Sequence, residues 1–147
     1  MKKFLASVLV IIFQIVWVDN IGSSSNFKKP DKIEYYYSET KEWICLKKAI
    51  IQVESENKDY AIGTKNDWGC LQITPIYMKE CERLSGKDFN YIDRFDRNKS
   101  LEMFEIYQNH YNPEKDILKA IRLHNPKASS LYRDKILAIY KSYLNNF

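Results

Sequence analysis

The chain has 147 residues and a formal net charge of +4 at neutral pH. Gly and Pro number only four each, which argues against a many-turned β architecture and favours helices. A charge this small argues against a cationic membrane-active protein and gives no reason to expect a nucleic-acid partner, but it is compatible with a polyanionic one.

Residues 1–25 have the layout of a secretory leader. Two lysines precede an apolar run from Phe4 to Val18, and small polar residues follow it. The run is shorter than the ~20 residues that a membrane-spanning helix needs. We therefore expect residues 1–25 to be a secretory leader or an uncleaved N-terminal membrane anchor. Residues 26–147 would then form one domain of an exported protein in the periplasm or cell envelope, or secreted, with membrane contact only through the leader.

The cysteines are Cys45, Cys70 and Cys81. In an exported chain an odd number allows at most one internal disulfide, and the sequence leaves open which pair forms, if any. Their spacing matches no paired zinc-ligand pattern, and His110 and His124 are the only histidines. We therefore expect neither a metal site nor another cofactor.

A first helix is predicted from Lys41 to Glu56, because apolar residues recur there every three or four positions. The apolar stripe consists of Trp43, Leu46, Ile50 and Val53. Glu54 follows the last of these directly. It is therefore expected near the C-terminal end of the helix, at the edge of its buried face.

The segment 57–73 holds two glycines and several turn-forming residues, which predicts an irregular connection or a small β-hairpin. Thr74 and Pro75 then give a helix start, with threonine as the N-cap and proline in the first turn. This second helix is expected to run to about Ser85, with Gly86 placed to terminate it.

Three further helices are predicted in the second half of the chain. The first runs from Ser100 to His110, and the next opens at Asn112 and Pro113 and ends before Asn125 and Pro126. The last begins near Ser129. Their predicted inward-facing residues are Leu101, Phe104, Tyr107 and Tyr111, then Ile117, Ala120, Ile121 and His124, then Tyr132, Ile136, Ile139, Tyr140 and Tyr143.

Glu54 is the best candidate for a catalytic carboxyl. A general acid must keep its proton near neutral pH, and burial against apolar groups raises a carboxyl pKa in the required direction. The predicted helix sets Glu54 against Ile50, Ile51 and Val53, whereas Glu56 and Asp59 are expected to point into solvent. The alternative is that Glu54 is an ordinary surface or capping residue.

The four stretches "AIIQVES", "WGCLQITP", "RFDRNKSLEMFEIY" and "AIRLHNP" resemble the lytic transglycosylase and goose-type lysozyme superfamily. In that family a helix ends in a Glu-Ser pair, and Gly-Leu-Met-Gln follows some fifteen residues later. Here "AIIQVES" supplies the pair, and "WGCLQITP" stands at the matching interval. Further along, "RFDRNKSLEMFEIY" is similar to the helix after the family's Asp-Pro segment, and "AIRLHNP" is similar to its Tyr-Asn-Ala-Gly or Trp-Asn-Gly-Gly element. The resemblance runs from about Trp43 to Tyr140.

The resemblance implies a mostly α, lysozyme-like single domain, with the irregular or hairpin segment following the catalytic helix. Glu54 would be the catalytic acid/base of a peptidoglycan-cleaving muramidase. The implied substrate-binding residues are Ser55, Gly69, Gln72, His124 and Asn125. In this view Gln72 lines the cleft floor, and Gly69 lets the backbone pass close to the sugar. The implied partner is a peptidoglycan glycan strand, bound by a monomer.

Several of these positions have a purely structural alternative. Gln72 would satisfy backbone groups, His124 would be a core histidine, and Tyr35, Tyr36 and Tyr37 would be packing residues instead of a sugar-stacking platform. The sequence also departs from the family pattern, for example at Cys70, which replaces an apolar residue, and at His124, which replaces an aromatic one.

The reaction outcome depends on a second carboxylate. A lytic transglycosylase uses one glutamic acid twice and forms a 1,6-anhydro-muramoyl end, whereas a lysozyme normally needs a second acid to activate water or to stabilise the oxocarbenium ion. Asp67 is the candidate second acid, and its alternative is a turn-forming residue. We expect a lytic transglycosylase. The alternatives are a lysozyme using Asp67 and a non-catalytic wall-binding or structural protein of the same fold.

Overall fold

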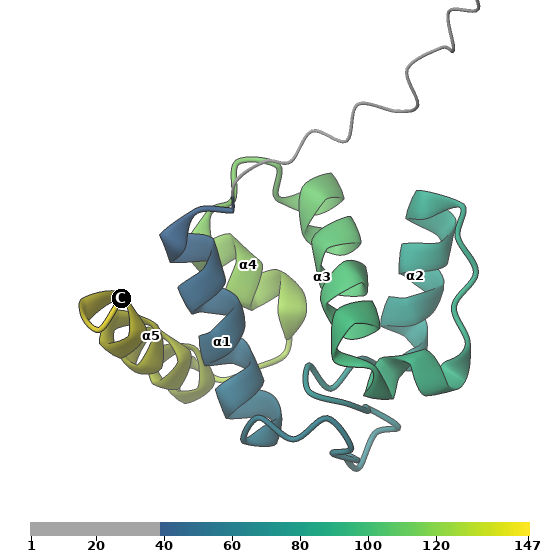
Figure 1. Cartoon of the computed structure of the whole chain (residues 1–147), viewed down its shortest axis with the longest axis horizontal. Helices are drawn as coiled ribbons and strands as arrows, with labels where there is room; N and C mark the ends of the chain where they lie inside the picture. The colour runs from purple at the N-terminus through teal and green to yellow at the C-terminus, as the bar shows by residue number, and fades with distance from the viewer. Residues whose placement is uncertain (1–38) are drawn as a thin grey trace, which may run out of the picture. The chain divides into compact units, whose positions relative to one another are not determined.

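The computed structural model describes residues 39–147; the predicted leader and the three consecutive tyrosines lie outside the described residues. Within this part of the chain there are five α-helices and one 3-10 helix (Figure 1). They are α1 (Lys41–Ser55), α2 (Pro75–Ser85), η1 (Tyr91–Phe95), α3 (Arg97–Tyr111), α4 (Ile117–His124) and α5 (Ser130–Asn145). The prediction of a mostly helical domain is confirmed. None of the helices in residues 39–147 has the length and apolar character needed to span a bilayer.

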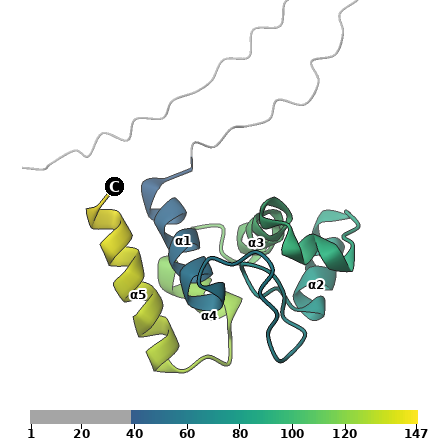
Figure 2. The ribbon, with the colours of Figure 1, turned by 60° about the horizontal axis from the view of Figure 1, so that its bottom comes forward.

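The helices form two groups joined by α4. Helices α1 and α5 lie side by side, and α2 packs against α3 on the other side of the molecule (Figures 1 and 2). Helix α4 contacts α1, α3 and α5 and so connects the two groups. The segment 57–73 runs from the C-terminal end of α1 to the start of α2. The site described below lies where this segment, α2 and α4 meet the end of α1.

Helix α1 forms where the apolar periodicity predicts it. The Thr40 side chain caps its first turn by accepting a hydrogen bond from the Trp43 N–H, and Glu56 ends it in the left-handed region with φ of 53°. Seven residues of this helix are buried, among them Trp43, Leu46 and Ile50 of the predicted stripe. Val53 is partly buried against the same core. Helix α1 is therefore a central element of the domain, and this fixes the position of its C-terminal end.

Both predicted ends of α2 and the predicted start of α5 are confirmed. Thr74 caps α2 with Pro75 in its first turn, and Gly86 ends the helix with φ of 68°. Ser129 caps α5 by accepting a hydrogen bond from the Tyr132 N–H. Of the inward-facing residues predicted for α5, Ile136 is fully buried and the other four are partly buried against the core.

The starts predicted for the third and fourth helices are wrong. Helix α3 begins at Arg97, three residues earlier than expected, because Asp96 supplies the N-cap. Helix α4 begins at Ile117 with Asp116 as its N-cap. Asn112 is instead fully buried, and its side chain donates to the carbonyl of Asp116 and accepts from the N–H of that residue. An asparagine that looks like a helix start therefore closes the α3–α4 turn.

The segment 57–73 was predicted to be either an irregular connection or a small β-hairpin, and it is irregular. Within it Trp68 makes isolated antiparallel bridges to Ile62 and Ile73, but no regular strand forms. Asp59, expected to point into solvent, is half-buried and pairs with Arg97 at 2.7 Å. The three cysteines are buried and unpaired, so no disulfide forms among them.

Candidate active site

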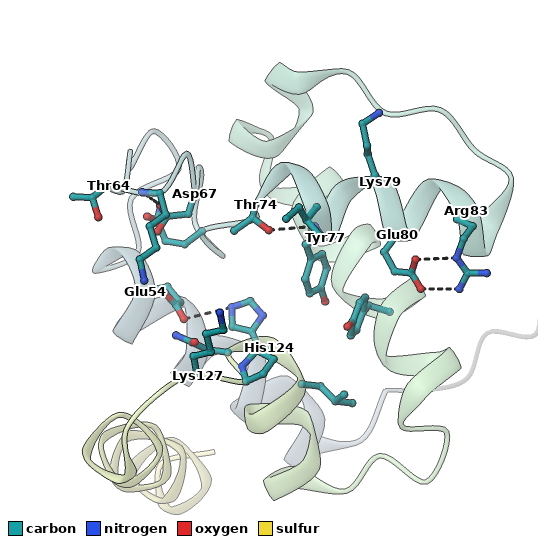
Figure 3. Close-up of a pocket in the computed structure, with 17 residues that line it drawn as sticks. Glu54, Thr64, Asp67, Thr74, Tyr77, Lys79, Glu80, Arg83, His124 and Lys127 are labelled. Carbon is teal, nitrogen blue, oxygen red and sulfur yellow. Dashed lines mark hydrogen bonds and ion pairs between the residues drawn. The ribbon is translucent and has the colours of Figure 1, made fainter.

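Glu54 lies at the mouth of a cleft of about 1010 Å³. Its side chain projects from the last turn of α1 and is 14% exposed. The walls come from the 57–73 segment, α2, α3, α4 and the loop after α4 (Figure 3). A carboxyl that is largely buried yet open to a cleft on one side can exchange a proton with a bound molecule while most of its surroundings exclude water.

One oxygen of Glu54 is held by two side chains from other helices. The hydroxyl of Tyr132, on α5, donates a hydrogen bond to Glu54 Oε1. His124 Nε2, at the end of α4, lies 3.5 Å from the same oxygen. Because both contacts converge on Oε1, they fix the orientation of the carboxyl and leave Oε2 for other partners.

The pKa of Glu54 is set by opposing effects. Burial raises it, but the hydrogen bond and the charge of His124, together with the hydrogen bond from Tyr132, outweigh burial and bring the pKa below its usual value. The helical pattern predicts that burial raises the pKa of Glu54 on balance, and in its net direction that prediction is wrong. The apolar stripe of α1 does raise the pKa; the groups that reverse the sign come from α4 and α5. In the unliganded protein near neutral pH, Glu54 is therefore ionised.

Asp67 lines the same cleft from the irregular segment. Its Oδ1 accepts a hydrogen bond of 2.7 Å from the backbone N–H of Lys65, as a turn-forming aspartate does. The backbone of Gly63 also passes so close that a Cβ there would meet the Asp67 carboxylate. Asp67 thus combines both roles that the sequence left open, a turn residue whose side chain borders the cleft (Figure 3).

Gln72 also lines the cleft, and its amide is used structurally. Its Nε2 donates to the carbonyls of Ala61, at 3.2 Å, and Gly69, at 2.8 Å. Its backbone has φ of 48°, which is unusual for a residue other than glycine. The alternative reading, that Gln72 satisfies backbone groups, is correct, and Gln72 stabilises the segment that forms part of the cleft wall.

Two predicted substrate-binding residues do not line the cleft. Ser55 is buried, and its hydroxyl donates to the Ile51 carbonyl one turn back in α1. Gly69 has φ of 79°, and a Cβ there would lie 1.6 Å from the backbone oxygen of Arg94. Glycine is therefore needed at this position for packing against η1. The resemblance implied that Gly69 lets the backbone pass close to a sugar, but Gly69 does not line the cleft.

His124 and Asn125 lie together at the end of α4, and both line the cleft. The side chain of His124 is only 4% exposed, so it is nearly a core residue as well as a cleft residue. Asn125 caps the C-terminus of α4 through its backbone N–H, which donates to Ile121. The resemblance predicts that both residues face the same cleft as Glu54, and their positions agree with that prediction.

Sequence reasoning missed the contribution of two residues. The helical pattern of α5 predicts only a packing role for Tyr132. A buried tyrosine hydroxyl usually has a hydrogen-bond partner, and this general rule is the signal that could have pointed to its contact with Glu54. Arg94 is fully buried in η1, donates to the carbonyls of Tyr91, Asn66 and Ile73, and stacks on Trp68 with its guanidinium carbon 4.0 Å from the ring centroid. No local pattern marks Arg94, because two of its three carbonyl partners, Ile73 and Asn66, lie 21 and 28 residues away.

Among residues 39–147 no group of three or more His, Cys, Asp or Glu side chains is placed to hold a metal ion. The ionisable groups that line the cleft or contact Glu54 include the Glu54 carboxyl, the His124 imidazole, the Tyr132 phenol and the Asp67 carboxylate. Such a set is suited to proton transfer at a bound substrate.

No protein-family model, no curated protein and no solved structure matches this chain. The resemblance to the lytic transglycosylase and goose-type lysozyme superfamily stays a prediction, and the function is argued from the site itself.

Proposed function

We propose that the protein is a peptidoglycan-cleaving muramidase, and specifically a lytic transglycosylase, with Glu54 as its single acid/base. The observation that carries the proposal is the setting of Glu54. It is a largely buried carboxyl at the end of a core helix, oriented through one oxygen by two neighbours and open to a cleft of about 1010 Å³. Glycosidases place their catalytic carboxyls in settings of this kind.

In the proposed reaction, the protonated Glu54 carboxyl gives its proton to the glycosidic oxygen between N-acetylmuramic acid and N-acetylglucosamine. The bond from this oxygen to the muramoyl C1 breaks. The resulting carboxylate then takes the proton of the muramoyl 6-hydroxyl, whose oxygen attacks C1 and closes the 1,6-anhydro ring. Glu54 is regenerated in its acid form, so one carboxyl serves both steps.

Glu54 must hold a proton to begin this cycle, although it is ionised in the unliganded protein. The charged state of Glu54 is supported mainly by His124. A glycan that fills the cleft excludes water, and loss of water raises the pKa of a carboxyl. Substrate binding is therefore proposed to return a proton to Glu54. This protonation takes place where the leaving oxygen is bound.

Hydrolysis is the second candidate, and the position of Asp67 favours it. Asp67 borders the same cleft and is a carboxylate from a different segment, as a lysozyme mechanism requires. Because Asp67 Oδ1 is already engaged by the backbone of Lys65, we favour the single-carboxyl route. The proposed location is the cell envelope, reached through the predicted leader.

The proposal is tested by the release of soluble fragments from purified peptidoglycan by the leaderless protein. Glu54→Gln is expected to lower turnover by at least about a hundredfold, as for loss of a general acid. Glu56→Gln is the matched control, because Glu56 is solvent-exposed two residues further on and pairs only with Lys58 among the described residues. Equal activity of all three proteins would refute a catalytic role for Glu54. Wall binding without release by a folded wild type would favour the non-catalytic alternative.

A further inference from the structure

Two buried polar atoms in the wall of the cleft have no hydrogen-bond partner within the described residues. They are the hydroxyl of Tyr77, on α2, and Nδ1 of His124. Both residues line the cleft beside Glu54. Buried polar groups are nearly always paired, and an unpaired one is costly. Two such atoms in adjacent residues of one cleft indicate that a polar group from outside the chain completes this part of the site.

The two residues are neighbours with a defined relative orientation. Their ring centroids are 6.1 Å apart and the ring planes meet at 67°. The Nε2 edge of the imidazole serves Glu54. In the view of Figure 3 the imidazole of His124 lies between the Glu54 carboxylate and Tyr77. The ring of Tyr107, which also lines the cleft, stacks on Tyr77 with the ring centroids 4.4 Å apart.

A secondary amide matches these two atoms chemically, because it presents a donor and an acceptor on separate atoms. If His124 carries its proton on Nε2 alone, Nδ1 accepts the amide N–H and the Tyr77 hydroxyl donates to the amide carbonyl. If His124 is doubly protonated, Nδ1 donates to the carbonyl and the hydroxyl accepts the N–H. The match therefore holds in both protonation states of His124.

We propose that Tyr77 and His124 form an amide-binding subsite, and that its ligand is the acetamido group of an N-acetylated sugar in the cleft. This inference rests on the proposed function in taking the ligand to be a glycan. A carboxylate only accepts hydrogen bonds, so it cannot serve Nδ1 when His124 carries its proton on Nε2 alone. A sugar hydroxyl is a poorer match than an amide, because its single oxygen would have to bond to both the Tyr77 hydroxyl and His124 Nδ1. Leu123 also lines the cleft and offers an apolar contact for the acetamido methyl.

Binding here has a favourable starting point. Both atoms are already out of contact with water, so a ligand that reaches them gains hydrogen bonds without the protein losing bonds to solvent. For the ligand to reach these buried atoms a side chain of the cleft wall must rotate, as commonly happens on binding.

The test compares the affinities of two neutral trisaccharides, tri-N-acetylchitotriose and cellotriose, by NMR titration of the leaderless protein. Cellotriose carries hydroxyl groups in place of the acetamido groups. We expect the wild type to prefer the acetylated sugar and Tyr77→Phe to reduce that preference about three- to tenfold, the effect of one hydrogen bond. Tyr140→Phe is the matched control, because it removes the hydroxyl of a partly buried tyrosine on α5 that does not line the cleft, and it should keep the preference.

Tyr77→Phe should not lower the Tm, since the hydroxyl it removes has no partner in the described residues. The inference is overturned if Tyr77→Phe keeps the full preference, or if it weakens both sugars equally. An amide in the substrate belongs either to a sugar acetamido group or to the attached peptide. Comparing N-acetylmuramic acid with and without its first two amino acids separates these two sources. An effect of Tyr77→Phe confined to the peptide-bearing compound would rule out the sugar acetamido group. A wild type that shows the preference but releases nothing from peptidoglycan would refute the proposed function and support this subsite.

Discussion

Nε2 of His124 lies 3.5 Å from Oε1 of Glu54, although the two residues are 70 positions apart and belong to different helices. This contact changes the sign of the pKa shift at Glu54. Burial alone would make the carboxyl a weaker acid, and His124 together with Tyr132 makes it a stronger one. The chemistry of the cleft therefore depends on where α4 and α5 pack against the end of α1.

Replacing His124 with phenylalanine should extend activity to higher pH. The change removes the hydrogen bond and the charge that lower the pKa of Glu54, and it leaves the effect of burial in place. A larger fraction of Glu54 then holds its proton at a given pH. We expect the alkaline limb of kcat/KM against pH to move to higher pH.

Tyr132→Phe provides the graded comparison, because its hydrogen bond contributes less to the lowered pKa than His124 does. It should move the alkaline limb in the same direction by a smaller amount. Identical limbs in the wild type and both variants would show that Glu54 does not govern the pH dependence.

The same shift predicts how stability changes in acid. A carboxyl whose pKa is lower in the folded than in the unfolded protein contributes stability above its unfolded pKa, near 4.5. That contribution is lost as the pH falls through the folded pKa. The free energy of unfolding of the wild type should therefore fall more steeply between pH 6 and pH 3 than that of Glu54→Gln. Urea denaturation at a series of pH values measures this, and parallel curves would contradict the lowered pKa.

Two glycines with the same backbone conformation should respond very differently to alanine. Gly69 and Gly86 both have positive φ, but a Cβ at Gly69 would collide with the backbone of Arg94, whereas nothing lies within 4 Å of one at Gly86. Gly86→Ala should cost about 1 to 2 kcal/mol from backbone strain alone. Gly69→Ala should cost more and displace the segment that carries Asp67 and Gln72. Equal losses of Tm would show that the contact with η1 is unimportant.

Asp67→Asn separates the two reaction outcomes. Asparagine can still accept the hydrogen bond from Lys65 that shapes the turn, so the change removes the charge and keeps the local geometry. With a single-carboxyl mechanism, the rate of fragment release should stay within about threefold of the wild type. A loss comparable to that of Glu54→Gln, about a hundredfold, would assign Asp67 a direct part in the chemistry.

The sequence predicted helix ends well where the determining interactions are local. Thr74, Pro75 and Gly86 act within one turn of α2, and their effect can be read from their order in the chain. Asn112 misled the prediction because its side chain bonds to Asp116 and Gln108 in the interior instead of capping a helix start. Residue types that cap helices also close turns, and tertiary packing decides between the two roles.

The sequence predicted most of the residues that border the cleft, but not the contacts between them. Glu54, Asp67, Gln72, His124 and Asn125 do border one cleft. Ser55 and Gly69 do not border it. The Ser55 hydroxyl is bonded within α1, and Gly69 packs against the backbone of η1. The role of Tyr132 and the direction of the Glu54 pKa shift depend on contacts of α1 with α5 and α4. No short stretch of sequence contains these partners together.

The most direct test of a single-carboxyl transglycosylase is mass spectrometry of the fragments released from purified peptidoglycan by the leaderless protein. Glu54→Gln is analysed in parallel. The account predicts 1,6-anhydro-muramoyl ends from the wild type and none from the variant. Reducing muramoyl ends from the wild type would contradict it and identify a lysozyme, in which Asp67 or a bound water completes the reaction.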